Sequence, residues 1–284
     1  MTTIGVVSPG AMGSALARAW AGGGSTVLTT VDGRSRRTRH LAEGLTQLPD
    51  VAAVVAASDV VVSICPPHAS SDVLDSVLAA ANAQDARPVV ADLNAVAPDT
   101  VEGYAARAAR RGIDLIDGSI SGGPPRPGGD THLYLSGEQA AVLAGLRADG
   151  LRTRVVGDRP GLASAVKMCT ASVYKGTTAL WAQALQTAHE LGVLDVVLAD
   201  LAEAFPETAE RAARLVATAT SKSDRFVAEM EEIAATQRAA GVSGELFDGM
   251  AAVYRRLSST ELAGSTPEEA RDMRELTEVL RRLR

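Results

Sequence analysis

Lys167 is the residue of this 284-residue chain best suited to proton transfer. It falls in the second turn of a run from about residue 159 to 192 that predicts one helix, opened by Pro160 in the first turn. Its neighbours in that turn are small or apolar. Burial among such neighbours lowers the pKa of a lysine toward neutrality, which is the condition for exchanging a proton. A lysine on an amphipathic helix can also extend to water, and the helix alone leaves both interpretations open.

Two further polar positions follow predicted strands and are candidates to contact a ligand. Asn94 comes shortly after the strand at 88–92, where its amide can hydrogen-bond a cofactor or a substrate. Ser121 precedes Gly122 and Gly123, and its hydroxyl with their backbone N–H groups offers donors suited to a carboxylate. The surrounding stretch at 118–129 is rich in glycine and proline, which predicts a loop with a constrained backbone. A purely structural loop is the competing interpretation.

A strand, a glycine turn and a helix open the chain. The strand is the apolar run at 4–7, the turn reads Ser-Pro-Gly-Ala-Met-Gly at 8–13, and a helix-forming run follows. This order is the setting of a dinucleotide fingerprint, in which glycines admit a pyrophosphate and the helix N-terminus holds it. Ser8 replaces the first glycine of that fingerprint, so another α/β ligand or a plain turn remains an alternative. The residues expected at the cofactor are Pro9, Gly10, Ala11, Met12 and Gly13.

The residues after the second predicted strand favour NADP over NAD. Asp32 stands where an acidic side chain binds the 2′-hydroxyl of NAD, but Arg34, Ser35 and Arg37 follow at once. Guanidinium groups beside a hydroxyl form a good site for the 2′-phosphate of NADP. Alternatively, these arginines cover the solvated start of a helix.

Cys65 and Pro66 begin a rigid loop after another buried strand, at 59–64. Two prolines end this strand, and its carboxyl end lies at the edge of the sheet where ligands bind in α/β folds. We therefore expect Cys65 and Pro66 to line the cofactor. His68 in the same loop is a less favoured candidate, because a lone histidine is more often a surface residue.

The order of predicted elements divides the chain into two parts. Strands and helices alternate up to about residue 157, which predicts a parallel α/β sheet. Every later segment is helical by pattern, near 195–204, 206–218, 223–240, 243–257 and 267–283. The helix at 159–192 is expected to be roughly 45–50 Å long and to join two bodies. The predicted fold class is an α/β Rossmann domain, residues 1–158, followed by an all-α helical domain, residues 159–284, joined by this long interdomain helix.

The bulk composition excludes several classes of protein. A net charge of −6 argues against a general nucleic-acid binder, and two distant cysteines with four scattered histidines indicate neither a disulfide framework nor a metal site. No charge-free apolar run reaches the ~18 residues of a membrane span, and the N-terminus shows no targeting segment. We expect a cytoplasmic protein that acts on a small molecule, without nucleic-acid or membrane partners.

Four motifs in this order resemble those of the β-hydroxyacid dehydrogenase superfamily, which is related to 6-phosphogluconate dehydrogenase and to imine reductases. The turn at 9–13 is similar to its G-L-G-x-M-G, the stretch 117–123 to its D-x-P-V-S-G-G, and 92–98 to its D-x-S-T-x-x-P loop. Residues 161–167 resemble the segment that presents its catalytic lysine, so the resemblance implies that Lys167 is a general acid/base. The later part resembles a subgroup whose C-terminal domain has no known function. The resemblance further implies a homodimer formed through the helical domains, and an active site in a cleft where the long helix faces the nicotinamide.

The chain departs from the superfamily pattern at three places. Ala171 stands where an asparagine usually binds substrate, Asn94-Ala95 replaces Ser-Thr, and Ser119 replaces a proline. These changes leave the machinery of hydride transfer in place, but they make the usual small 3-hydroxyacid substrate uncertain.

The expected function is that of an NADP(H)-dependent oxidoreductase acting on a carbonyl or hydroxyl carbon of a small, carboxylate-bearing substrate. Lys167 would move the proton, Ser121 with Gly122 and Gly123 would anchor the carboxylate, and Asn94 would orient the substrate or the nicotinamide. An imine reductase on the same fold and a non-catalytic NADP-binding protein are the main alternatives. A Rossmann-like methyltransferase fits a two-domain chain with this helix poorly.

Overall fold

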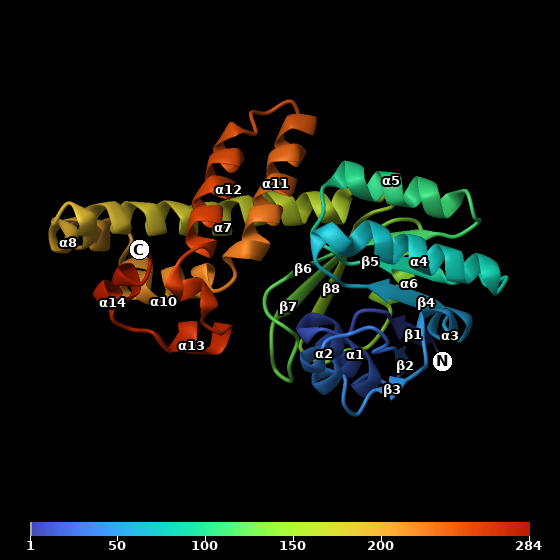
Figure 1. Cartoon of the computed structure of the whole chain (residues 1–284). Helices are drawn as coiled ribbons and strands as arrows, with labels where there is room; N and C mark the ends of the chain where they lie inside the picture. Colours follow the sequence, from blue (N-terminus) through green and yellow to red (C-terminus); the bar gives the residue numbers. More distant parts are fainter. Residues whose placement is uncertain (1) are drawn as a thin grey trace. The chain divides into compact units, whose positions relative to one another are not determined.

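The computed structural model describes residues 2–284, which form two compact units, one up to Met168 and one from Cys169 to Arg284. The described strands all belong to the first unit, and the second consists of helices (Figure 1). The predicted order, a Rossmann-type parallel sheet followed by a helical region, is confirmed. The division falls inside one long helix, α7 (Leu162–Glu190), whose residues up to Met168 belong to the first unit.

One eight-stranded sheet organises the first unit. Its strand order is β3-β2-β1-β4-β5-β6-β7-β8, and all neighbours are parallel except β6 with β7. The strands are β1 (Thr3–Val6), β2 (Thr26–Thr29), β3 (Thr46–Gln47), β4 (Val60–Ser63), β5 (Val89–Asp92), β6 (Leu115–Ser121), β7 (Thr131–Ser136) and β8 (Leu151–Gly157). The order runs outward in both directions from β1 and β4, and ligands of open α/β sheets bind at the carboxyl ends beside such a switch point.

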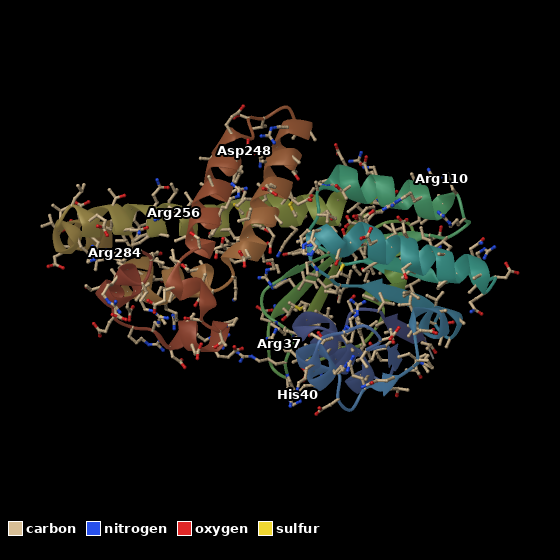
Figure 2. All side chains as sticks on the ribbon, in the orientation of Figure 1. Arg37, His40, Arg110, Asp248, Arg256 and Arg284 are labelled. Carbon is tan, nitrogen blue, oxygen red and sulfur yellow. The ribbon has the colours of Figure 1, made fainter. Side chains whose placement is uncertain are left out.

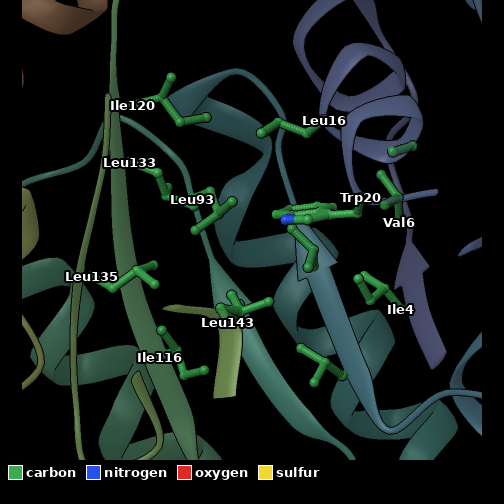
Figure 3. Packing of buried hydrophobic residues seen from close by; sticks show 14 of the residues in the cluster. Ile4, Val6, Leu16, Trp20, Leu93, Ile116, Ile120, Leu133, Leu135 and Leu143 are labelled. Atoms are coloured by element: carbon green, nitrogen blue, oxygen red, sulfur yellow. The ribbon is translucent and has the colours of Figure 1, made fainter. Parts of the chain in front are cut away.

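Helices cover both faces of this sheet. On one face, α1 (Ala11–Gly22) and α6 (Ala140–Ala144) pack on an apolar cluster in which Trp20 is fully buried (Figure 3). On the other face lie α3 (Val51–Ala56), α4 (Ser70–Ala83) and α5 (Pro98–Ala109). Strands between two helical layers are apolar on both sides, and the consecutive valines at 60–62 of β4 are all fully buried. Short helices α2 (Arg36–Leu41) and η1 (Pro67–Ala69) follow β2 and β4.

The strands differ from the sequence prediction in three places. β6 extends to Ser121, so the expected loop at 118–129 begins later, because residues 117–121 pair with the antiparallel β7. The sequence pattern predicts a closing strand at 154–157, but β8 begins at Leu151 because it pairs along all of β7. The two-residue edge strand β3 was not predicted, because its exposed sequence carries no apolar pattern.

The second unit is built from the remainder of α7 and seven further helices of the described chain. These are α8 (Leu194–Ala204), α9 (Pro206–Glu210), α10 (Ala212–Thr220), α11 (Ser223–Ala239), α12 (Glu245–Ser258), α13 (Pro267–Asp272) and α14 (Leu276–Arg281), with the short η2 (Glu261–Gly264) before α13. No helix within residues 2–284 has both the length and the apolar character needed to cross a membrane.

Two of the helices predicted as single segments are broken. The segment at 206–218 divides into α9 and α10 at Arg211, whose backbone leaves the helical region. The segment at 267–283 divides into α13 and α14, because Met273 is extended and the Arg274 guanidinium donates to the carbonyls of Arg271 and Met273. These side-chain bonds satisfy carbonyl groups that a continuous helix would have used.

Candidate cofactor and active site

The glycine turn between β1 and α1 has no room for side chains at its inner position. A Cβ on Gly13 would lie 2.3 Å from the carbonyl oxygen of Ser8, whereas a Cβ on Gly10 would meet nothing within 4 Å. Ser14 Oγ donates to the carbonyl of Pro9 at 3.0 Å and also bonds the carbonyl of Gly10. The first turn of α1 therefore holds the loop in place and leaves open space beside Gly10, where a pyrophosphate can approach the backbone.

Two buried polar atoms beside this turn have no hydrogen-bond partner within the described residues: Ser8 Oγ and Arg34 Nε. Arg34 reaches back from the end of β2, and its Nη2 donates to the carbonyl of Val7 at 3.0 Å. Buried polar groups are nearly always satisfied, so unsatisfied donors at a sheet edge indicate a missing ligand. A dinucleotide supplies phosphate and ribose oxygens, so these residues fit an NAD(P) cofactor.

The start of α2 carries the other residues expected at the 2′-phosphate. Ser35 is the N-cap, and its hydroxyl accepts the backbone N–H of Thr38 at 3.2 Å. The side chain of Arg37 is exposed on the same short helix, next to His40 (Figure 2). Arg34, which is partly buried, and the exposed Arg37 thus present two guanidinium groups beside the end of β2.

Asn94 is 2% exposed, and both ends of its amide are engaged within the protein. Its Oδ1 accepts the backbone N–H of Cys65 at 2.6 Å, and its Nδ2 donates to Asp92 at 2.7 Å and to Ser63 Oγ at 3.2 Å. Asn94 therefore joins the end of β5 to the loop after β4. The predicted contact of Asn94 with a ligand stays a prediction, and the observed bonds assign it a role in holding the Cys65 backbone.

Burial dominates the acid–base behaviour of this edge. It raises the pKa of the Asp92 carboxyl to about 7, against the lowering effect of two hydrogen bonds from Asn94. Burial also raises the pKa of the Cys65 thiol to about 11, so this thiol stays protonated at neutral pH. Pro66 and His68, in the same loop, are exposed. Sequence inspection did not single out Asp92, because an acid at a strand end is usually solvated.

Lys167 lies on the first unit's part of α7, partly buried, with its ammonium at the end of β6. Its Nζ donates to the carbonyl of Ile120 at 2.6 Å. Ile120 directly precedes Ser121, the last residue of β6, so the lysine and the serine share one strand end. β5 and β6 are parallel, which places the carboxyl end of β6 on the same sheet edge as Asn94. The carboxyl edge of the sheet thus carries three residues that the sequence predicts at the site, Lys167, Ser121 and Asn94.

The loop after Ser121 is open and conformationally unusual. Gly122 has φ of +107°, a backbone conformation that side chains disfavour, and both Gly122 and Gly123 are exposed. Thr131 Oγ1 donates to the carbonyl of Gly123 at 2.8 Å and fixes the far side of the loop. The loop at the two glycines is therefore open to solvent, so an anion can reach it.

Asp117 anchors the start of α7, a role that sequence inspection missed. It is fully buried and accepts the backbone N–H groups of Gly161 and Ser164 at 2.9 and 3.0 Å, and the Ser164 hydroxyl at 2.7 Å. Ser136 Oγ donates to Asp117 at 2.9 Å and accepts from the N–H of Ala163 at 3.1 Å. A carboxylate at this end of the helix also interacts favourably with the positive end of the helix dipole. Asp117 and Ser136 thus cap the start of α7 from distant parts of the chain.

Comparison with known proteins identifies the family of the first unit. Residues 3–144, half of the chain, match the family described as the NAD binding domain of 6-phosphogluconate dehydrogenase. The chain belongs to this family. Residues 188–257 match a domain of unknown function (DUF1932). Both matches confirm the resemblance drawn from the motifs, and membership makes the chain an NAD(P)-dependent oxidoreductase of the dehydrogenase or reductase type.

Solved structures share the fold of this chain over nearly its whole length. The conserved protein MTH1747 of unknown function, described as structurally similar to 3-hydroxyacid dehydrogenases, is 26% identical; the match covers 93% of this chain and 100% of that one, with a TM-score of 0.68. Mycobacterium tuberculosis 3-hydroxyisobutyrate dehydrogenase is 19% identical over 100% and 99% of the two chains, with a TM-score of 0.67. An imine reductase from Myxococcus stipitatus, solved with NAD⁺, is 22% identical over 100% of both chains, with a TM-score of 0.56. The last two likenesses show the fold alone.

Proposed function

We propose that this protein is an NADP(H)-dependent oxidoreductase that transfers hydride between the nicotinamide and a carbonyl or hydroxyl carbon of a small, carboxylate-bearing substrate. Lys167 is the general acid/base in this proposal. The observation that carries it is the 2.6 Å hydrogen bond from Lys167 Nζ to the carbonyl of Ile120, which holds the amine at the strand end beside Ser121. A primary amine held beside an anion-accepting loop is the pairing that carbonyl reduction needs.

The cofactor supplies the hydride, and the residues of this chain supply binding, orientation and a proton. The Ser121 hydroxyl and the Gly122 and Gly123 amides bind the substrate carboxylate. Lys167 Nζ donates its proton to the substrate oxygen on reduction and takes a proton from the substrate hydroxyl on oxidation. Asn94 orients the substrate or the nicotinamide through the Cys65 loop that it holds.

Preference for NADP follows from the cationic groups beside β2. The unpartnered Nε of Arg34, together with Ser35 and Arg37, favours a dianionic 2′-phosphate over a neutral hydroxyl. Arg34→Gln should raise KM for NADPH about tenfold or more and leave KM for NADH nearly unchanged. Equal losses with the two cofactors would remove Arg34 from 2′-phosphate recognition.

Lys167→Ala tests the central proposal. Turnover should fall by ~10²–10⁴, because the proton has lost its donor, while NADPH still quenches protein fluorescence with an unchanged dissociation constant. Lys222→Ala, on the second unit, is the matched control and should keep wild-type turnover. Wild-type turnover by the Lys167→Ala variant contradicts the proposal.

The assay should compare 2- and 3-hydroxyacids and their oxo forms with cyclic imines, since imine reductases share the fold. Imine turnover alone would favour the imine reductase. NADPH binding without turnover of any carbonyl or imine would favour a non-catalytic NADP-binding protein.

We also propose a homodimer formed through the helical domain. A hollow of about 850 Å³ between α7 and α12 is lined mainly by apolar residues, and Leu180, Leu191 and Leu246 along it are each at least 60% exposed. Exposed apolar surface of this extent marks an interaction site, and a twofold axis lets two copies cover the same surface on each other. Light scattering should give twice the chain mass, and Leu180→Glu with Leu246→Glu should give a monomer. A wild-type monomer at micromolar concentration would contradict the dimer.

A further inference from the structure

After Leu115, which packs in the apolar cluster on the other face, the residues of β6 alternate between an apolar and a polar row. Ile116 and Ile120 point into the apolar core cluster, whereas Asp117 and Ser119 are buried and bond the start of α7 instead. Residues two apart on a strand share a face, so Ser121 continues the polar row at the strand end. A strand whose only task was to fill the core would not need buried polar groups on its second face.

Ser119 contacts α7 one turn before Lys167. Ser119 is 1% exposed, and its Oγ donates to the carbonyl of Ala163 at 2.7 Å. In an α-helix the carbonyl of residue 163 also accepts the backbone N–H of residue 167. The hydroxyl therefore fixes the opposite end of the helical turn that carries the lysine. The next residue of β6, Ile120, accepts the bond from Lys167 Nζ, so two consecutive residues of one strand hold both the turn and the ammonium group.

We propose that Ser119 is a positioning residue for Lys167, setting the place of its ammonium group through the Ala163 carbonyl. This inference rests on the proposed function of Lys167 as general acid/base. The first turn of α7 is bonded by Asp117 at its N–H groups and by Ser119 at a carbonyl, so it is held against both rotation and translation relative to β6. A proton donor must be placed to within a fraction of an ångström, and a misplacement of about 1 Å can cost ~10²-fold in rate.

Two measurements on Ser119→Ala and Ser119→Thr test this inference. The first is the steady-state rate: Ser119→Ala should lower kcat ~10- to 100-fold with KM for NADPH unchanged, and Ser119→Thr, which keeps the hydroxyl, should recover most of the rate. The second is competitive acetylation of amines read by mass spectrometry, which is clean because the chain has only three lysines. Lys167 should be acetylated about three- to tenfold faster in Ser119→Ala, and Lys175 and Lys222 at their wild-type rates.

Ser58→Ala is the matched control. Ser58 Oγ also donates to a helix carbonyl, that of Val54 in α3 at 2.7 Å, but Ser58 lies before the amino end of β4, on the opposite edge of the sheet. Equal losses of rate in Ser58→Ala and Ser119→Ala would overturn the inference, because the effect would then be general destabilisation. Unchanged Lys167 acetylation in Ser119→Ala would overturn it as well. The acetylation rate does not depend on catalysis, so it decides the position of Lys167 even if Lys167→Ala shows that the proposed function is wrong.

Discussion

The two lysines of α7 are held by different kinds of acceptor in the two units. In the first unit, Lys167 donates to a backbone carbonyl. In the second unit, Lys175 pairs with the carboxylate of Glu229, which is 7% exposed and also bonded by Arg225 at 3.0 Å. A carboxylate stabilises an ammonium group far more than a carbonyl does, so it opposes loss of the proton. Two partly buried lysines of one helix thus differ in the charge of the group that accepts their hydrogen bond.

The same contrast extends to the surroundings. The nucleotide-binding edge keeps two buried donors without partners, Ser8 Oγ and Arg34 Nε, as a site prepared for a ligand should. Around Lys175, by contrast, the Phe226 ring lies 4.7 Å from Nζ, and Tyr254 Oη donates to the Lys175 carbonyl at 2.7 Å. The surroundings of Lys175 are thus closed by side-chain packing and by the ion pair with Glu229.

The prediction with the largest expected effect concerns the Lys175–Glu229 pair, and its failure would contradict the contrast between the two lysines. Glu229→Gln should lower the free energy of unfolding by about 3–5 kcal/mol, because the partly buried ammonium group of Lys175 loses the buried carboxylate that neutralises it. Urea denaturation measures the loss, and kcat of the folded fraction should stay near wild type. The double variant Lys175→Met with Glu229→Leu should recover most of the stability. A variant that keeps its stability but loses turnover would assign the pair to the chemistry.

The next effect is a pH dependence that belongs to the first unit. The pKa of Asp92 is about 7 in the folded protein against 3.8 for the free group, so the folded state binds the proton more tightly between those values. Stability from this group is therefore fully present below pH 4 and is lost progressively as the pH rises from 4 to about 7, by up to roughly 4 kcal/mol in total. Denaturation between pH 4 and 8 should show this slope up to about pH 7, and Asp92→Asn should flatten it. The exposed Asp75→Asn is the control that should leave the slope intact, and an unchanged slope in Asp92→Asn would rule Asp92 out as its source.

The prediction with the smallest expected effect compares substitutions at two glycines of the turn between β1 and α1. Gly13→Ala should cost about 1–3 kcal/mol of stability and weaken NADPH binding, because its Cβ would overlap the Ser8 carbonyl. Gly10→Ala should keep the stability and weaken NADPH binding alone, since its Cβ has free space that only a ligand would fill. Thermal unfolding and fluorescence titration measure the two quantities. Undiminished NADPH binding by Gly10→Ala would mean that the pyrophosphate does not approach there.

Local sequence predicted those parts of the fold that depend on local chemistry. Apolar runs gave the buried strands, the glycine turn gave the link from β1 to α1, and Pro160 with the following run gave α7 nearly to its ends. The extension of β6 to Ser121 depends on pairing with β7, and the break at Met273 depends on the Arg274 side chain. Such long-range or side-chain partners cannot be read from periodicity.

The candidate site shows the same limit. The residue types at 94, 121 and 167 indicated chemistry, and the structure brings these positions to one sheet edge. The direction of the Asn94 amide, toward Cys65 and Asp92, is set by tertiary contacts. Ser119 was noted only as a replaced proline, because its partner at residue 163 lies 44 positions away.

The cap that Asp117 places on α7 decides how this protein can be recombined with its relatives. In a hybrid joined at residue 158, Asp117 would face the α7 backbone of the relative. The lysine would also come from the relative that supplies the helical part. A junction after residue 168 would instead keep the sheet, the Asp117 cap and Lys167 together from one parent protein. Exchange of helical domains is therefore expected to keep Lys167 and the Asp117 cap on their own sheet only when the crossover lies within α7.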